Sequence, residues 1–355
     1  MKTFHCEQCD HVLFFENTTC VGCGRGVGFA PDVLEMRTFG DGTAYRACAN
    51  YAEHQVCNWL LPNDASGQLC RSCELTHVIP DLDSDANREA WYRLETAKRR
   101  MLYTLLSLRV PVVTRLQDPA GGLEFQFKSE AGMPEGEAVL TGHDNGVITL
   151  NLAEADDAER ERRRVQLHEP YRTLLGHFRH EIGHFYWDQL IRDDPERLQA
   201  FRALFGNDEL DYAEALKAHY AAGAKPTWEQ GFISAYATSH PWEDWAESWA
   251  HYMHMVDGLE TAAACGLRVK PERADEPALK AVPLDSSLAT FDRLGRDWIA
   301  LTYVMNNLNR SMGLQDAYPF VLSGPALAKL EFVHQTIAAA AAASDQGGQR
   351  PTIAA

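Results

Sequence analysis

The sequence lacks any long apolar run, which excludes a helical membrane span within it. Such a helix needs about 20 consecutive apolar residues, and none of the hydrophobic stretches in these 355 residues approaches that length. Residues 1–5, before the first cysteine motif, are too few for the apolar region of a signal peptide. We therefore expect a soluble protein with a cytoplasmic location.

Positive charge is also scarce, because 33 Lys and Arg residues stand against 50 Asp and Glu residues, giving a formal net charge of -17. Proteins that bind nucleic-acid backbones usually show a basic face or an alkaline pI, whereas the pI here is near 5.2. We expect no nucleic-acid partner, and we interpret the acidity as a self-repelling, solubilising surface.

Cysteine is nearly absent after residue 73, where only Cys265 of the nine cysteines remains. In a chain without an export signal, clustering of the other eight indicates metal sites rather than disulfides. The first set is Cys6-x2-Cys9 followed by Cys20-x2-Cys23 and Gly24. A two-residue gap lets both thiolates of a tight turn face one metal, and a glycine beside the turn permits positive φ. These four residues therefore predict a closed, structural zinc site in a zinc ribbon.

The second set is more widely spaced and consists of Cys48, Cys57, Cys70 and Cys73. A second four-cysteine structural zinc site is the preferred interpretation. A disulfide pair, buried free thiols and replacement of one ligand by His54 remain alternatives at this point. We assign residues 1–85 to a zinc-ribbon region that serves for folding alone or for docking a protein partner, since so short a segment needs such staples to hold a core.

Residues 86–340 are expected to form a mostly helical domain with a small strand region, and residues 341–355 a disordered tail. The expected helices cover residues 87–108, 169–191, 195–204, 211–221, 241–256, 288–312 and 325–342. The charged run at residues 156–164 is expected to be a solvated helix face or a loop. Strand-like pieces cover residues 122–128, 138–141 and 146–152, with a turn at residues 144–146. The last of these strands is expected to lie at a sheet edge, where it would bind extended substrate through main-chain hydrogen bonds.

The helix predicted over residues 169–191 contains the motif HEIGH at residues 180–184. Residues four apart share one helix face, so His180 and His184 can bind the same ion, and Gly183 removes side-chain bulk. Glu181 lies beside them, placed to take a proton from the attacking water and pass it to the leaving amine. We expect His177 to have a packing or hydrogen-bonding role.

A catalytic zinc requires a third protein ligand and one open position. Position 190, where a third histidine would follow in another class of zinc peptidase, is Leu. Pro241 and Trp242 open a later helix in which Glu243 is the predicted third ligand and Glu247, one turn on, is the carboxylate that orients an imidazole. The reverse assignment, with Glu247 as the ligand, remains open. His251 and His254 are expected to support the ligands or to pack.

The string Glu-x-x-Ala-Glu at residues 243–247, after a distant HExxH, resembles the gluzincin metallopeptidases. In that class the first glutamate of the string ligates zinc. One of its subgroups has a tyrosine seven residues before this ligand that stabilises the transition state, and the matching position here is Tyr236. The resemblance implies that the Tyr236 phenol donates to the oxyanion; a buried core tyrosine is the alternative.

The chain as a whole, over about residues 1–340, resembles bacterial zinc-binding metallopeptidases that carry an N-terminal zinc ribbon. The resemblance rests on the cysteine pairs at residues 6–9 and 20–23 and on the strings at residues 57–59, 79–82, 180–188, 242–247 and 306–313. It implies a zincin-like α+β domain.

We therefore predict a zinc metallopeptidase with one catalytic and two structural zinc ions, which hydrolyses peptide bonds with Glu181 as the general base. The alternative is an interaction or regulatory protein that acts through its ribbons and carries a latent zincin domain. Capping of the zinc by His251 or Cys265 would favour that alternative.

Overall fold

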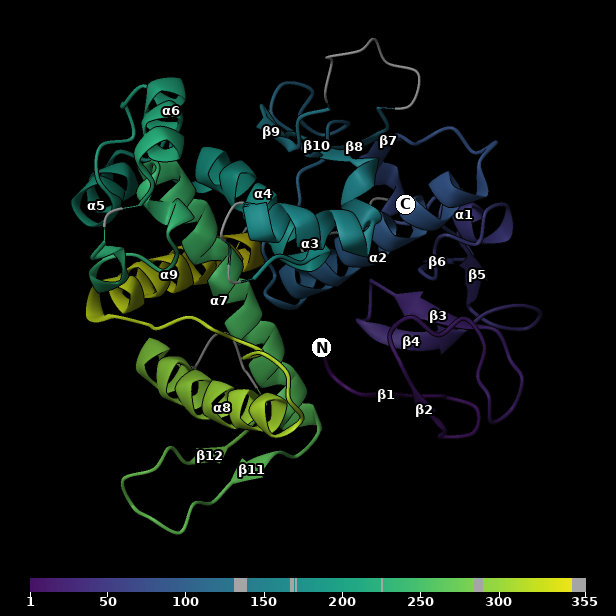
Figure 1. Cartoon of the computed structure of the whole chain (residues 1–355). Coiled ribbons are helices and arrows are strands. Elements are labelled where there is room, and N and C mark those ends of the chain that lie inside the picture. Colours follow the sequence, from purple (N-terminus) through teal and green to yellow (C-terminus); the bar gives the residue numbers. More distant parts are fainter. Residues whose placement is uncertain (131–138, 167–168, 170, 225, 284–289, 347–355) are drawn as a thin grey trace. The chain divides into compact units, whose positions relative to one another are not determined.

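The structure is a computed structural model that describes residues 1–355 except 131–138, 167–168, 170, 225, 284–289 and 347–355. The chain forms two compact units, Met1–Arg162 with the C-terminal residues from Ala341, and Arg163–Ala340. Helices and strands are both present, as predicted (Figure 1). Among the described helices, none has both the length and the apolar character that a bilayer crossing requires.

The first unit begins with short antiparallel strand pairs. These are β1 (Phe4–His5) with β2 (Val12–Leu13), β3 (Val27–Ala30) with β4 (Glu35–Thr38), and β5 (Tyr45–Ala47) with β6 (Leu60–Pro62), and α1 (Ala49–Ala52) lies between the last two in sequence. Phe29 is the centre of their small aromatic core, with ring centroids 4.9 Å from Phe15 and 5.1 Å from Trp59. Strands this short bury little apolar surface, so this region needs additional stabilisation, such as bound metal ions.

Helix α2 (Asp85–Ser107) supplies a larger apolar surface to the first unit. Ser84 caps it by accepting a hydrogen bond from the Asn87 amide at 3.4 Å. Apolar residues recur along this helix at helical spacing, and they are buried: Trp91, Leu94, Ala97, Met101, Leu102 and Leu105. The structure also buries three charged residues of this helix, Glu95, Lys98 and Arg99, which the periodicity did not predict.

A four-stranded sheet, in the order β7-β8-β10-β9, completes the first unit. Strands β7 (Thr76–Val78), β8 (Glu124–Lys128) and β10 (Val147–Asn151) are parallel, and β9 (Gly142–Asp144) is antiparallel to β10. The predicted turn is confirmed, with φ of 46° at Asn145 and 83° at Gly146, a conformation that favours glycine.

Two expectations about these strands are wrong. Strand β10 has a neighbour on each side, so it is not the edge strand that we predicted. The strand expected at residues 138–141 lies instead at Gly142–Asp144, and residue 138 is outside the described residues.

The second unit is built from helices, of which α4 (Leu174–Leu190) and α7 (Pro241–Ala264) pack most closely. The Thr173 hydroxyl caps α4 by accepting a hydrogen bond from the Gly176 amide at 3.0 Å, so this helix begins later than residue 169. Helix α7 opens with Pro241, as predicted, and His240 Nδ1 accepts a hydrogen bond from the Trp242 amide at 3.0 Å.

The remaining helices follow the predicted order along the chain. They are α3 (Asp157–Gln166), α5 (Pro195–Phe205), α6 (Tyr212–Ala222), α8 (Phe291–Ser311) and α9 (Gly324–Gln346). The pair β11 (Arg268–Val269) and β12 (Leu279–Lys280) was not predicted. Helix α9 continues to Gln346, so the first part of the expected disordered tail is helical, and residues 347–355 lie outside the described residues.

Gly183 sets the close approach of α4 and α7. A Cβ atom added at Gly183 would lie 3.0 Å from Ala246 Cα and 3.1 Å from Trp249 Cβ. The indole of Trp245 donates to the Gly183 carbonyl at 2.8 Å across the same contact. The first turns of α7 are thereby held against the HExxH segment of α4.

Candidate metal centres

The first cysteine cluster consists of Cys6, Cys9, Cys20 and Cys23, whose sulfur atoms all lie within 4.8 Å of one another. The Sγ atoms of Cys6 and Cys23 are 3.8 Å apart, and those of Cys9 and Cys20 are 3.6 Å apart. Four sulfurs bound tetrahedrally to zinc at about 2.3 Å lie on the order of 3.8 Å from one another, whereas a disulfide bond is about 2.05 Å. The spacing therefore fits a zinc ion.

The two cysteine turns of this cluster have equivalent backbone geometry. The amide of Asp10 donates to the Cys6 carbonyl and that of Gly24 to the Cys20 carbonyl, both at 2.8 Å. Gly24 has φ of 74°, which confirms the positive φ expected beside the second turn, and Asp10 has φ of 60°. Cys6 and Cys20 are buried, while the second cysteine of each turn is exposed.

The second cysteine cluster consists of Cys48, Cys57, Cys70 and Cys73, and all four are buried. The Sγ atoms of Cys57 and Cys70 are 3.6 Å apart, and backbone amides of Cys70 and Trp59 donate to the sulfurs of Cys48 and Cys57 at 3.3 Å. All the cysteines are free, so the disulfide alternative is wrong for this structure. His54 lies beside Glu53, with its Nε2 3.7 Å from the carboxylate, and is not among the four donors.

Buried cations from α2 adjoin the second cysteine cluster. Lys98 Nζ donates to the Ser72 carbonyl at 2.8 Å, and Arg99 donates to the Val56 carbonyl at 2.7 Å; these carbonyls immediately precede Cys73 and Cys57. Burial lowers the pKa of Arg99, but the nearby thiols and Glu95 outweigh it and raise the pKa. Four thiolates and one Zn²⁺ carry a net charge of about -2, and these buried cations offset it.

The histidine–glutamate cluster consists of His180, His184 and Glu243, whose donor atoms also lie within 4.8 Å of one another. Glu243 Oε2 is 2.9 Å from His180 Nε2 and 3.5 Å from His184 Nε2. Two imidazoles and a carboxylate are a ligand set of catalytic zinc, with bonds of about 2.0–2.2 Å. The predicted residues are thus brought together, with the helix pair α4 and α7 as their support.

Glu247 lies on the other side of the His180 ring. Its Oε1 is 2.7 Å from Nδ1 of His180, and so it approaches the nitrogen that faces away from Glu243. Burial opposes protonation of His180, but Glu243 and Glu247 together raise its pKa well above the ordinary value. Two carboxylates on opposite sides of one imidazole favour positive charge there, which a zinc ion bound between Nε2 and Glu243 would provide while Glu247 keeps its contact with Nδ1.

Glu181 is buried on α4 beside the two histidine donors. Its Oε1 lies 3.3 Å from Nε2 of His177, one turn earlier. Burial raises the pKa of Glu181, yet the contact with His177 and the charges of the neighbouring imidazoles outweigh it, so the pKa is lowered. Glu181 is accordingly a carboxylate at neutral pH, and His177 has the hydrogen-bonding environment that we expected.

Three aromatic residues surround the cluster. Tyr236, in the 3-10 helix Tyr236–Thr238, has its ring centroid 5.9 Å from that of His180. Trp242 covers His184, with ring centroids 3.9 Å apart. Tyr212 was not predicted as a site residue, and its hydroxyl donates to Glu243 Oε1 at 2.5 Å. Burial and the charge of Glu243 raise the pKa of Tyr236 well above its usual range.

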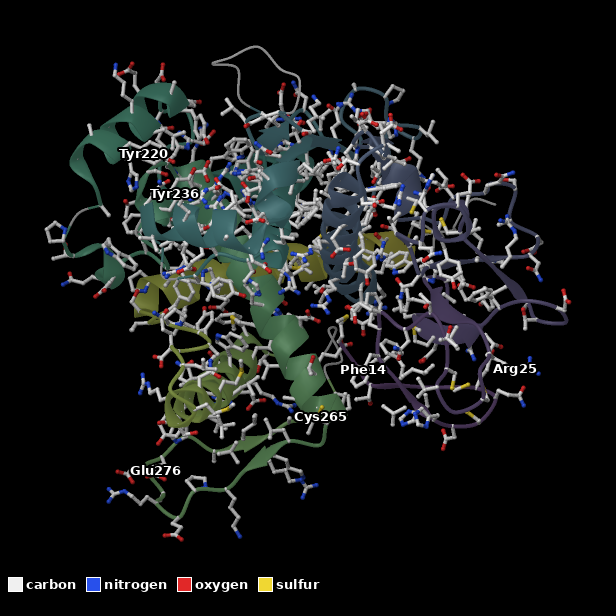
Figure 2. All side chains as sticks on the ribbon, turned by 45° about the vertical axis from the view of Figure 1, so that its right-hand side comes forward. Phe14, Arg25, Tyr220, Tyr236, Cys265 and Glu276 are labelled. Atoms are coloured by element: carbon white, nitrogen blue, oxygen red, sulfur yellow. The ribbon has the colours of Figure 1, made fainter. Side chains whose placement is uncertain are left out.

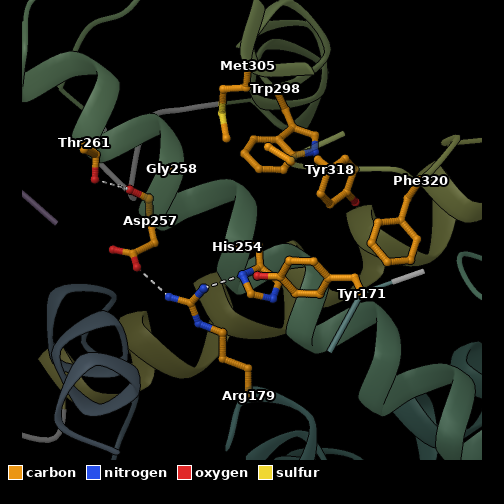
Figure 3. Close-up of a pocket in the computed structure, with 11 residues that line it drawn as sticks. Tyr171, Arg179, His254, Asp257, Gly258, Thr261, Trp298, Met305, Tyr318 and Phe320 are labelled. Atoms are coloured by element: carbon orange, nitrogen blue, oxygen red, sulfur yellow. Dashed lines mark hydrogen bonds and ion pairs between the residues drawn. The ribbon is translucent and has the colours of Figure 1, made fainter. Parts of the chain in front are cut away.

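The two later histidines of α7 have other partners. His251 Nδ1 lies at hydrogen-bond distance, 2.7 Å, from the Tyr318 hydroxyl, and His254 Nδ1 lies 2.6 Å from the Arg179 guanidinium, which also pairs with Asp257 at 2.5 Å. Figure 3 shows His254, Arg179 and Asp257 in the wall of a cavity of about 220 Å³, together with the rings of Tyr171, Trp298, Tyr318 and Phe320. The packing or supporting role expected for both histidines agrees with these contacts.

Helices that present two imidazoles and a carboxylate, together with sulfur clusters of zinc geometry, define a zinc-binding metalloprotein of mixed helix and sheet. The comparisons agree: residues 87–336 match the family described as "Putative zinc-binding metallo-peptidase", and residues 3–84 match a zinc-ribbon domain. The chain belongs to this metallopeptidase family.

Its relatives include uncharacterised proteins of Mycobacterium bovis and Mycobacterium tuberculosis. Each is 44% identical over 353 residues, which cover 99% of this chain and 100% of the relative. No solved structure matches the chain.

Proposed function

We propose that this chain is a zinc-dependent peptidase with a zincin-like domain and that His180, His184 and Glu243 are the ligands of its catalytic zinc. The observation that carries the proposal is the convergence of two Nε2 atoms and one carboxylate oxygen, with Glu243 Oε2 2.9 and 3.5 Å from the imidazoles. Glu247 is then the residue that orients His180 through Nδ1, as such carboxylates do in zinc sites. The two cysteine clusters hold the structural zinc ions.

A zinc ion held there would supply Lewis acidity, polarising a peptide carbonyl and lowering the pKa of water. Glu181 is the general base, which accepts a proton from the attacking water and delivers it to the leaving nitrogen. Its lowered pKa keeps it in the basic form at neutral pH. His177 holds this carboxylate on the adjoining helical turn, with Nε2 3.3 Å from Oε1.

Tyr236 is the oxyanion donor in this proposal. Its ring lies 5.9 Å from that of His180, and its raised pKa keeps the phenol protonated so that it can donate a hydrogen bond. Peptide or protein chains are the proposed substrates, and the cytoplasm is the proposed location.

Capping of the zinc by His251 or Cys265 would have favoured the alternative, a latent domain in a ribbon-based interaction protein. Both are among the described residues, and neither belongs to the converging donors. His251 is engaged with Tyr318, and Cys265 is the exposed C-cap residue of α7 (Figure 2). The peptidase is accordingly the favoured function.

The test combines zinc counting with cleavage of a peptide library by the purified full chain. We expect about three zinc ions per chain in the wild type and in Glu181→Gln, while cleavage by the variant falls by about 10²–10⁴-fold because the base is lost. Glu276→Gln, in the exposed loop before β12 (Figure 2), is the matched control and should cleave as the wild type does. Unchanged cleavage by Glu181→Gln, or zinc in the cysteine clusters alone, overturns the proposal.

A further inference from the structure

The two oxygens of the Glu243 carboxylate have different surroundings. Oε2 faces the imidazoles of His180 and His184, whereas Oε1 accepts a hydrogen bond from the Tyr212 hydroxyl at 2.5 Å. The Glu243 side chain is 1% exposed, so this phenol takes the place of water at Oε1. A carboxylate held in this way presents a single oxygen toward a metal.

Tyr212 is itself held in a defined position at the start of α6. Asp211 caps this helix by accepting from the Glu214 amide at 2.9 Å, which makes Tyr212 its first residue. The carbonyl of Leu210 accepts from His240 Nε2 at 3.1 Å, and the Tyr212 ring lies against that histidine with centroids 5.4 Å apart. The start of α6 is thus attached to the start of α7 through backbone and side-chain contacts.

Helix α6 is attached to the rest of the second unit at its two ends. All eleven of its residues are described, and none of them is buried. At its far end, His219 Nδ1 lies 3.3 Å from the Thr238 hydroxyl, and Tyr220 hydrogen-bonds with Tyr236. At its near end, the hydrogen bond from Tyr212 to Glu243 connects the first turn of α6 with the interior of the second unit.

From this geometry we propose that Tyr212 is a positioning residue for the metal ligand Glu243 and that it couples occupancy of the metal site to the placement of α6. The inference rests on the proposed function, because it takes Glu243 as a zinc ligand. Removing the phenol hydroxyl frees the Glu243 carboxylate to rotate and to bind water, which lowers the affinity of the site for the metal. Loading the metal fixes Glu243 and, through Oε1, the first turn of α6.

The experiment uses the full chain with Tyr212→Phe, which removes only the hydroxyl. Zinc affinity of the histidine–glutamate cluster, measured by competition with a chromophoric chelator, should fall about 10–100-fold, as is usual when a partner of a metal ligand is lost. The cysteine clusters should keep their zinc in the variant. When zinc is removed from the histidine–glutamate cluster alone, Tyr212→Phe and the wild type should have the same unfolding midpoint. Tyr303→Phe, on α8 and 45% exposed, is the matched control and should bind as the wild type does.

Hydrogen exchange tests the coupling to α6 without any assay of activity. Addition of zinc alone to protein lacking the third ion should slow amide exchange in the first turns of α6 in the wild type, and less in Tyr212→Phe. Equal zinc affinity and equal exchange in wild type and variant would overturn the inference. Failure of the wild type to bind a third zinc would instead overturn the proposed function.

Discussion

The cysteine clusters and the histidine–glutamate cluster use opposite means of holding a metal. Each cysteine cluster supplies four sulfurs from turns and short strands, so metal and fold depend on one another. The histidine–glutamate cluster supplies three donors from α4 and α7, which already pack through apolar side chains and the Gly183 contact. The two kinds of cluster are thus expected to differ in how much of the surrounding fold remains if the ion is removed.

The largest expected effect follows from loss of one sulfur in the second cysteine cluster. Cys57→Ser should remove one zinc ion and unfold the surrounding region, because structural zinc contributes about 10–16 kcal/mol to small zinc domains. His184→Asn, the matched change in the histidine–glutamate cluster, should also remove one zinc ion but leave the helices folded. Zinc counting and circular dichroism measure both effects, with the exposed Cys265→Ser as the control. Equal stability of Cys57→Ser and His184→Asn would contradict the comparison.

A smaller effect is expected at the buried cations of α2. Arg99→Met removes a guanidinium that is 2% exposed and offsets the negative charge of the second cysteine cluster. Breaking such a buried arrangement costs about 3–5 kcal/mol, measurable by chemical denaturation of the zinc-loaded chain. Arg100→Met is the neighbouring control: the Arg100 side chain is 40% exposed and pairs with Glu16, so the cost should be about 0–1 kcal/mol. Similar losses in both variants would mean that the buried charge is unimportant.

The third and smallest expected effect is a loss of folding stability at acidic pH, caused by protonation of His251 on α7. Burial lowers the pKa of His251 to about 4 from 6.5, and the charge of Glu247 only partly opposes this. The unfolded chain therefore binds the proton first, so stability falls as the pH drops from 6.5 to 4 and is unaffected above 6.5. The shift corresponds to about 3 kcal/mol.

Denaturation across this pH range with His251→Gln checks that prediction, since glutamine can still form a hydrogen bond with Tyr318 and does not titrate. Glu247, His180 and His254 also face His251 and are present in both proteins. The variant should lose about 3 kcal/mol less than the wild type between pH 6.5 and 4. If the free energies of unfolding of the two proteins change in parallel with pH, His251 takes up its proton in the folded chain as readily as in the unfolded chain, which contradicts the prediction.

The local parts of the metal centres were predictable from sequence because they depend on short-range spacing. Residues four apart on a helix, and cysteines two residues apart in a turn, bring His180 to His184 and Cys6 to Cys9 whatever the rest of the fold does. Glu243 was predicted from the helix that Pro241 opens, but Glu247 remained an alternative, because the choice between them depends on how α7 crosses α4.

Other features depend on tertiary contacts that no spacing rule conveys. Lys98 and Arg99 read as part of a polar helix face, yet they are buried because carbonyls beside cysteines accept their hydrogen bonds. Tyr212 opens an otherwise exposed helix, and only the approach of α7 gives it Glu243 as a partner. The position of β10 within its sheet depended likewise on partners distant in the chain.

The contact between Gly183 and Ala246 has a consequence for the spacing of the donor atoms on α4 and α7. A Cβ at Gly183 would lie 3.0 Å from Ala246 Cα, so even one methyl group there would displace the neighbouring backbone by a few tenths of an ångström. Bonds from zinc to nitrogen and oxygen ligands vary by only about 0.2 Å, so a displacement of that size would disturb the approach of His180 and His184 to Glu243. The distance between donors on two helices is therefore set in part by backbone packing away from the ligands themselves.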